Sequence, residues 1–192
     1  MARPEPEGRG PVLLALAREA IGRELGVREP EAPRPAWLLE PGNTFVTVRV
    51  RGSLHGCVGT VSSPRPLEED VPANARAAAF RDPRSRPLEP EEWRLTELEV
   101  SLLSPREPLF PASEGELRGE LRPGMDGLIL EYGVWRGAFL PQVWEALPDP
   151  GIFLAQLKLK AGLPADFWHP DLRASRFTVR KWREREILAA RG

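Results

Sequence analysis

The sequence predicts an α+β fold in which an antiparallel or mixed β-sheet carries packed helices. Segments with a two-residue apolar period occur in adjacent pairs, as they do in β-hairpins. Separate segments have the spacing of amphipathic helices. Strands and helices do not alternate one by one along the chain, so we expect no βαβ units and no parallel sheet.

The first part of the chain predicts a helix followed by a hairpin. Residues 1–9 are polar and are expected to form a flexible leader. Apolar residues recur at helical spacing over 11–25, which predicts an amphipathic packing helix. The prolines within 28–42 predict an irregular connection. Residues 43–51 and 53–61 alternate on either side of a short turn and predict a hairpin.

The middle of the chain predicts a helix and a half-buried strand. We expect Asp70 to cap a helix that carries a stripe of small residues and ends near Asp82. Residues 95–104 alternate, which places Leu98, Val100 and Leu102 on one face and polar side chains on the other. Residues 105–123 contain several prolines and glycines and are interpreted as a loop.

The last part predicts a second hairpin, a helix and a final strand. Residues 126–132 and 134–140 flank Gly133, which predicts the hairpin. Asp149 is expected to cap a helix that Gly162 ends. A strand over 174–182 precedes a basic tail, 184–192, so that the folded domain extends over 10–183.

Composition excludes several classes of protein. Hydrophobic residues make up 41% of the chain, charged residues 29%, and the formal net charge is -1, as in ordinary globular proteins. No apolar run approaches the ~20 residues of a membrane span, and the N-terminus is too polar for a signal peptide. We therefore expect a cytoplasmic protein without membrane contact. Two histidines and one cysteine are a poor ligand set, so we expect no metal and no organic cofactor.

Charge is distributed unevenly along the chain. The segment 158–192 holds nine basic and four acidic residues, whereas 89–120 holds nine acidic and three basic residues. A basic tail can bind nucleic acid, but no nucleic-acid motif accompanies it, and a charge run is usually a solvated face. We expect no nucleic-acid partner, and the sequence predicts no particular oligomeric state.

The stretch 53–61 concentrates the chemistry of the chain, because it holds the single cysteine and one of the two histidines. Side chains two residues apart in a strand point to the same face, so His55 and Cys57 are predicted to lie side by side. Gly56 and Gly59 flank Cys57, and glycine within a strand marks a bulge or a close approach of backbone or ligand. The stretch therefore predicts a site on a rigid sheet.

Each candidate residue has two interpretations. Cys57 is either a nucleophile, redox thiol or shared metal ligand, or a buried core cysteine. His55 is either its acid–base partner or a structural histidine. Glu99, on the polar face of the strand over 95–104, either orients an imidazole or belongs to a solvated strand face.

Residues 54–60, Leu-His-Gly-Cys-Val-Gly-Thr, resemble the Leu-Arg-Gly-Cys-Ile-Gly-Thr signature of the AMMECR domain family, whose prokaryotic members are called AmmeMemoRadiSam system protein A. The resemblance extends from about residue 10 to about residue 183. It departs from the family pattern at His55, where the family has arginine, and at Ser85, where phenylalanine is usual. Further segments in the family's order are 77–84, 98–105, 124–128, 140–143 and 160–163.

The resemblance implies an α+β domain of two unequal subdomains, with the 54–60 motif near the cleft between them. It also implies companions similar to Memo proteins and radical S-adenosylmethionine (radical SAM) enzymes, and it implies no particular reaction. The candidate catalytic residues are Cys57, His55 and Glu99. The candidate substrate-binding residues are Gly56, Gly59, Thr60, Ser101 and Gln142.

Two functions of different class remain open at this point. The first is an enzyme or enzyme subunit that uses Cys57 in a small-molecule or protein-modification pathway. The second is a binding module that presents the 54–60 motif to a partner and performs no chemistry. A concave pocket with a reachable sulfur favours the enzyme, whereas a flat apolar patch over a buried sulfur favours the module.

Overall fold

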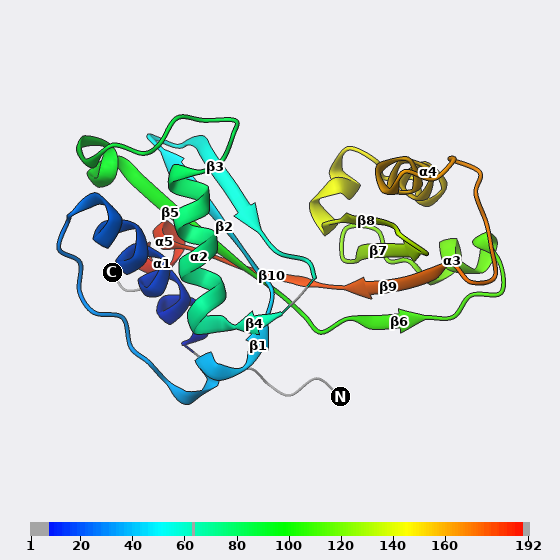
Figure 1. Cartoon of the computed structure of the whole chain (residues 1–192), viewed down its shortest axis with the longest axis horizontal. Helices are drawn as coiled ribbons and strands as arrows, with labels where there is room; N and C mark the ends of the chain where they lie inside the picture. The colour runs from blue at the N-terminus through cyan, green and yellow to red at the C-terminus, as the bar shows by residue number, and fades with distance from the viewer. Residues whose placement is uncertain (1–7, 63, 190–192) are drawn as a thin grey trace. The chain divides into compact units, whose positions relative to one another are not determined.

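A computed structural model describes residues 8–62 and 64–189, and the chain forms two compact units (Figure 1). The first unit runs up to Leu102 and resumes at Arg180, and the second is Leu103–Val179. Both contain an antiparallel sheet with helices, so the predicted α+β class with two unequal subdomains is confirmed. None of the helices in the described part of the chain is long and apolar enough to cross a membrane.

The first unit is built on a four-stranded sheet. Its strands, in spatial order, are β10 (Val179–Arg183), β5 (Thr96–Leu103), β2 (Thr44–Val50) and β3 (Ser53–Gly59). The chain reverses between β2 and β3 through Arg51 and Gly52, whose φ angles are 52° and 80°. Two successive positive φ values give a hairpin turn that matches the strand twist. A separate ribbon pairs β1 (Pro41–Gly42) with β4 (Arg65–Pro66).

The helices of this unit pack on one face of that sheet. They are α1 (Arg9–Leu25), α2 (Leu67–Phe80) and the short α5 (Glu184–Ala189). The unit also contains two 3₁₀ turns: η1 (Ala36–Leu39) follows α1 in the chain, and η2 (Pro90–Leu95) precedes β5. Figure 1 shows α2 lying along β2 and β3. Alternate strand residues enter the helix-side core, and the fully buried ones are Val46, Val48, Leu98 and Val100. The intervening strand residues therefore form the opposite face, which we call the open face.

The second unit is a smaller sheet covered by one long helix. Its strand order is β6 (Glu107–Leu109), β9 (Arg173–Phe177), β7 (Gly127–Tyr132) and β8 (Trp135–Phe139). Its helices are α3 (Glu114–Glu120), the 3₁₀ turn η3 (Pro141–Glu145) and α4 (Pro150–Ala161). Trp144 stacks on Phe153 with ring centroids 3.7 Å apart, and both belong to one buried apolar cluster.

The predicted ends of α4 are confirmed. The Asp149 carboxylate accepts a hydrogen bond from Ile152 N at 2.9 Å, which satisfies one free amide of the first turn. Gly162 follows the helix with φ 88°, a conformation that glycine adopts without steric cost.

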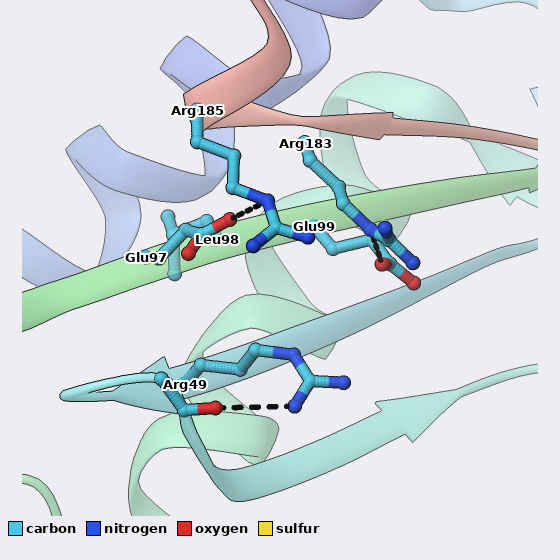
Figure 2. Close-up of a pocket in the computed structure, with 7 residues that line it drawn as sticks. Arg49, Glu97, Leu98, Glu99, Arg183 and Arg185 are labelled. Atoms are coloured by element: carbon cyan, nitrogen blue, oxygen red, sulfur yellow. Dashed lines mark hydrogen bonds and ion pairs between the residues drawn. The ribbon is translucent and has the colours of Figure 1, made fainter.

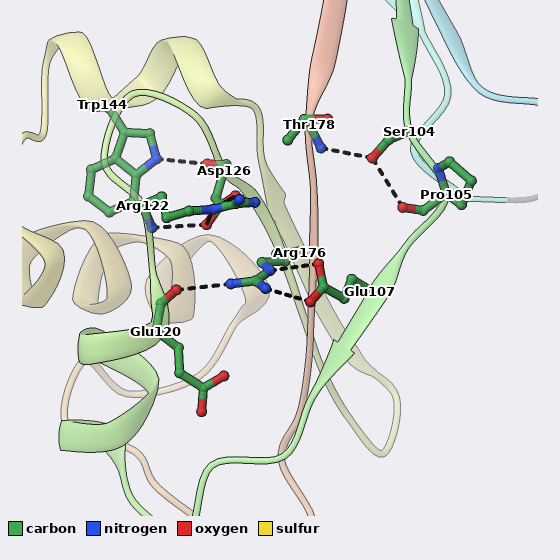
Figure 3. A network of polar contacts seen from close by, with 9 residues as sticks. All are labelled: Ser104, Pro105, Glu107, Glu120, Arg122, Asp126, Trp144, Arg176 and Thr178. Carbon is green, nitrogen blue, oxygen red and sulfur yellow. Dashed lines mark hydrogen bonds and ion pairs between the residues drawn. The ribbon is translucent and has the colours of Figure 1, made fainter. Parts of the chain in front are cut away.

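A buried carboxylate closes the loop before β7 (Figure 3). Asp126 is fully buried and accepts hydrogen bonds from Arg122, the shortest from Nη2 at 2.6 Å. The backbone oxygen of Asp126 accepts from Trp144 Nε1 at 2.7 Å. The hydrogen bond between Trp144 and Asp126 therefore connects the Gly-Met-Asp-Gly segment to the stacked aromatic core of the second unit.

The predicted strand over 174–182 is in fact two strands, β9 and β10, separated at Thr178. Thr178 N donates to Ser104 Oγ at 3.0 Å, and Ser104 N donates to Thr178 O at 2.9 Å (Figure 3). Period-two alternation continues through such a break, so the sequence pattern contains no signal for it.

Three further expectations were wrong. Asp70 does not cap α2 but lies inside its first turn with a fully buried side chain. The segment 105–123 contains β6 and α3. The basic tail begins with α5, whose Glu184 accepts from Arg18 Nε at 2.6 Å. Residues 1–7 of the expected leader and residues 190–192 of the tail lie outside the described residues. The leader was expected to extend to residue 9, but Arg9 already begins α1.

Candidate functional site

Cys57 lies on the edge strand β3 and its side chain belongs to the open face. Thr47 of β2 is its partner in register, and Glu99 of β5 is the next residue in the same row. Cys57 is half-buried, and its sulfur accepts a hydrogen bond from Thr47 Oγ1 at 3.3 Å. Cys57, Thr47 and Glu99 therefore form one row across the sheet, with Thr47 between the thiol and the carboxylate.

His55 does not share this face, so the predicted His55–Cys57 pair is wrong. The register between β2 and β3 shifts so that Val48 pairs with Gly56 and Arg49 pairs with Leu54, which leaves His55 as an extra residue. The imidazole Nε2 lies 3.3 Å from Ala79 O at the end of α2. A β-bulge breaks strict alternation and turns this side chain toward the helix side.

Glu99 does not orient the imidazole. It is buried, and its Oε2 accepts from Arg183 Nε at 2.5 Å, while Lys181 Nζ lies 4.0 Å from Oε1. The hydrogen bond with Glu99 raises the pKa of Arg183. Its interpretation as part of a solvated strand face is also wrong, because strand β10 covers the carboxylate with basic side chains.

His55 acts electrostatically on the carboxylate of Glu92 in η2. The pKa of Glu92 is lowered, first by a hydrogen bond from Arg86 and least by the charge of His55. The three candidate catalytic residues are therefore divided between the two sides of the sheet, and they do not form a catalytic triad.

Two residues that sequence reasoning missed hold the cysteine in place. Asp82, just beyond α2, accepts a hydrogen bond from Cys57 N at 2.9 Å. Arg84 donates from Nη2 to Cys57 O at 2.9 Å and to Asp82 Oδ2 at 2.6 Å. One carboxylate and one guanidinium thus bind both backbone polar groups of Cys57. The signal was present in the sequence, because both residues belong to the 77–84 segment that follows the family's order.

The charge of Asp82 is strongly favoured in this arrangement. Its side chain is buried, and the hydrogen bond from the Arg84 guanidinium is the main cause that lowers its pKa, followed by those from the amides of Cys57 and Arg84. The same contact raises the pKa of Arg84. Asp82 therefore remains an anion whose role is to bind the backbone of β3 and of its own loop.

A second buried carboxylate fastens the other end of the motif. Asp70 accepts from Thr60 Oγ1 at 3.1 Å and from Thr44 N at 2.8 Å. Arg65 and Asn74 also donate to it, at 2.8 and 3.0 Å. Thr60, predicted to bind substrate, is thus bonded to a structural network at the start of α2.

Gly56 and Gly59 are sites of close packing. A Cβ atom on Gly56 would lie 2.0 Å from Ala78 O of α2, and one on Gly59 would lie 2.3 Å from the ring of Phe45. The φ angles of Gly56 and Gly59 are not positive. The absence of a side chain at Gly56 lets α2 approach β3, and its absence at Gly59 makes room for Phe45. Close packing therefore explains why glycine occupies both positions, and no bound ligand is needed to explain it.

The two remaining candidates lie in different units. Ser101 is buried on β5, opposite Phe45 in register and on the same face as Glu99. Gln142 is exposed on η3 of the second unit. Within the described residues, no three His, Cys, Asp or Glu side chains are grouped so that they could hold a metal ion.

The family model for AMMECR1 matches residues 14–182, which is most of the chain. The chain belongs to the AMMECR1 family. A relative from Thermococcus gammatolerans is 41% identical over 187 residues, which cover 91% of this chain and 90% of the relative. One from Thermofilum pendens is 40% identical over 187 residues, which cover 88% and 86%.

A crystal structure of an uncharacterised protein from Pyrococcus horikoshii is similar to this member of the AMMECR1 family over 91% of both chains. The TM-score is 0.76 and the identity is 36%. The motif at 54–60 and the segment 77–84 both lie within the AMMECR1 match, and the Asp82–Cys57 hydrogen bond joins them.

Proposed function

We propose that this chain is a non-catalytic binding module that presents the open face of the β2–β3 hairpin to a companion protein. The observation that carries the proposal is the attachment of β3. Asp82 and Arg84 bind the backbone of Cys57, and Asp70 binds Thr60. These contacts make the motif a rigid, preorganised surface, which lowers the conformational cost of docking.

The surroundings of the sulfur support binding rather than nucleophilic catalysis. A cysteine nucleophile is usually activated by an adjacent base. Among the described residues, the hydrogen-bond partner of Cys57 Sγ is the hydroxyl of Thr47. The imidazole of His55 contacts Ala79 O, and the carboxylate of Glu99 contacts Arg183. No base is therefore directed at the sulfur in this arrangement.

An exposed apolar side chain marks where a companion would dock. Leu54 begins the motif, pairs in register with Arg49 of the open face, and is 55% exposed. A large apolar side chain on a rigid strand, beside a charged residue, is typical of an interface anchor. The proposed companions are the Memo-like and radical SAM proteins that membership of this family suggests. We place the function in the cytoplasm, since a single unpaired cysteine suits a reducing compartment.

The test compares two exposed leucines of the first unit. Leu54→Glu should weaken binding to the purified Memo-like or radical SAM companion from the same organism by about tenfold or more. Leu39→Glu is the matched control, because Leu39 is 62% exposed but lies on η1, outside the β2–β3 hairpin. Isothermal titration calorimetry measures both. Equal affinities for the two variants, or no affinity of the native chain for either companion, contradict the proposal.

A second candidate function is a thiol reaction at Cys57, and the partial exposure of this residue favours it. Cys57→Ala separates the two. In the binding module Cys57 belongs to the docking face, so any change in the activity of the assembled system should follow a change in affinity for the companion. Loss of system activity with unchanged affinity, together with rapid iodoacetamide labelling of the native thiol, supports the thiol reaction instead.

A further inference from the structure

A polar pocket of about 240 Å³ opens beside the β2–β3 turn, at the opposite end of the hairpin from Thr60 (Figure 2). It belongs entirely to the first unit, since its residues come from β2, β5, the hairpin turn, β10 and the start of α5. The residues that line it are Arg49, Gly52, Glu97, Leu98, Glu99, Arg183 and Arg185. Figure 2 shows guanidinium and carboxylate groups from β2, β5 and the β10–α5 segment around this space.

The charges of the lining do not cancel. Three arginines and two glutamates contribute three positive and two negative charges, an excess of one positive charge. Arg183 pairs with Glu99 at 2.5 Å, and Arg185 Nε lies 3.4 Å from Glu97 Oε1. Two charges outside the lining offset one another, because Arg183 Nη1 lies 3.4 Å from Glu186 Oε1 and Lys181 Nζ lies 4.0 Å from Glu99 Oε1. Arg49 therefore remains as the source of the excess.

Arg49 is the pocket arginine without a carboxylate partner among the described residues. Its guanidinium has one hydrogen bond, from Nη1 to Gly52 O, and that bond is long at 3.4 Å. Arginine has five N–H donors in a fixed planar fork, so most of the donors of Arg49 remain available to a ligand. Its backbone is held by pairing to Leu54 on one side and Glu97 on the other.

We propose that this pocket binds a small organic monocarboxylate, with the ligand carboxylate paired to Arg49. The fork of a guanidinium matches the two oxygens of a carboxylate. One excess positive charge balances one carboxylate, whereas a phosphate dianion would be repelled by the two glutamates. The volume lies below the 300–1,000 Å³ typical of drug-sized ligands, which favours a small molecule.

The two glutamates define the rest of the ligand. Glu97 binds Arg185, and Glu99 binds Arg183 with Lys181 Nζ 4.0 Å from its other oxygen. Both carboxylates keep acceptor capacity on their remaining lone pairs. They select a ligand that carries an N–H or O–H donor close to its carboxylate. This inference requires neither the thiol of Cys57 nor a companion protein, so it stands or fails independently of the proposed function.

The test uses a pair of probes that differ in one charge. N-acetylglycine has a carboxylate and one amide N–H, whereas N-acetylglycinamide has the same skeleton without the charge. We expect N-acetylglycine to shift the Nε–Hε resonance of Arg49 in ¹⁵N-edited NMR spectra with a saturable dependence on concentration. N-acetylglycinamide should cause no saturable shift.

Variants of the intact chain assign the effect to Arg49. Arg49→Gln should weaken N-acetylglycine binding by about tenfold or more, followed through the backbone amide of Gly52. Arg49→Lys should retain part of the affinity, because it keeps the charge and loses the fork. Arg28→Gln is the matched control, since Arg28 is exposed and lies between α1 and η1. A melting temperature within about 2 °C of the native value shows that a variant is folded.

Several results would overturn the inference. The first is the absence of a saturable shift when N-acetylglycine is added to the native chain. The second is equal affinity for N-acetylglycine and N-acetylglycinamide, because the charge of the ligand would then be irrelevant. Equal affinity of Arg49→Gln and the native chain, or an equal loss in Arg28→Gln, would show that Arg49 is only a solvated surface arginine.

Discussion

Asp82 Oδ2 accepts a hydrogen bond from the backbone N–H of Cys57 at 2.9 Å, although the two residues are 25 positions apart in the chain. Cys57 lies on an edge strand, so its outward-facing amide has no strand partner. The carboxylate supplies the missing acceptor, and Arg84 supplies a donor to Cys57 O. The loop after α2 thus completes the edge of the sheet at the cysteine.

Asp82→Asn should destabilise the protein by about 1–3 kcal/mol. The amide loses one acceptor oxygen and removes the charge that faces Arg84, so either Cys57 N or the Arg84 guanidinium loses its partner. Urea denaturation followed by circular dichroism measures the change. Asp166→Asn is the chemical control, because Asp166 is exposed, and it should be neutral within about 0.5 kcal/mol. A neutral Asp82→Asn would show that this contact adds no stability.

The free energy of unfolding should decrease as the pH falls below about 4, the ordinary pKa of an aspartate. The pKa of Asp82 is lowered in the folded state, so the folded protein binds this proton less readily than the unfolded chain does. The stabilisation is complete above the unfolded pKa and is lost as the pH approaches the lowered one. Lowered pKa values of Glu92 and Glu107 act in the same direction.

The contribution of Asp82 to this pH dependence is separable. Denaturation curves between pH 7 and pH 2.5 should show a smaller decrease for Asp82→Asn than for the native chain. Equal slopes for the two proteins would mean that the carboxyl of Asp82 has the same pKa folded and unfolded.

Gly56→Ala should cost about 2–3 kcal/mol or more, or prevent folding. The added methyl group would lie 2.0 Å from the backbone oxygen of Ala78, and a helix backbone cannot move aside cheaply. Gly119→Ala is the matched control, because Gly119 lies in α3 with open space around its Cβ position. It should raise stability by about 0.5–1 kcal/mol, as alanine does in helices. Similar melting temperatures for both variants would refute the close-packing explanation of Gly56.

Cys57→Ala should cost about 1 kcal/mol, and Cys57→Ser should cost no more than that. Because Cys57 is half-buried and its sulfur accepts from Thr47, a serine hydroxyl at this position keeps a hydrogen-bond partner. Urea denaturation of both variants measures the difference. A serine variant that is clearly less stable than the alanine variant would indicate that the thiol occupies a dry core site.

The local elements of the fold were largely predictable from the sequence. The periodicity of 11–25 and of 95–104 predicted α1 and β5, and Asp149 with Gly162 predicted both ends of α4. Periodicity succeeds in these segments because burial on one side of a helix or strand is a local constraint. The short helix α3 was missed, since seven residues with two glycines carry little helical signal.

The site was predictable only in part. The motif at 54–60, its position on a hairpin strand and the placement of Glu99 on the face opposite the core followed from the sequence. The face of His55 did not, because one extra residue in β3 reverses the alternation beyond it, and a bulge depends on the register with the neighbouring strand.

The sequence by itself therefore determined the family, the fold class and the segment that holds the cysteine. Tertiary structure alone decided what surrounds that cysteine. Asp82 and Arg84 reach β3, and Asp70 reaches Thr60 just beyond it, only after α2 packs on the sheet. Arg49 and Arg183 line one pocket only when β10 returns to pair with β5. Hydrogen bonds and charges act between groups that are close in space, and a spacing along the chain does not encode that proximity for residues so far apart.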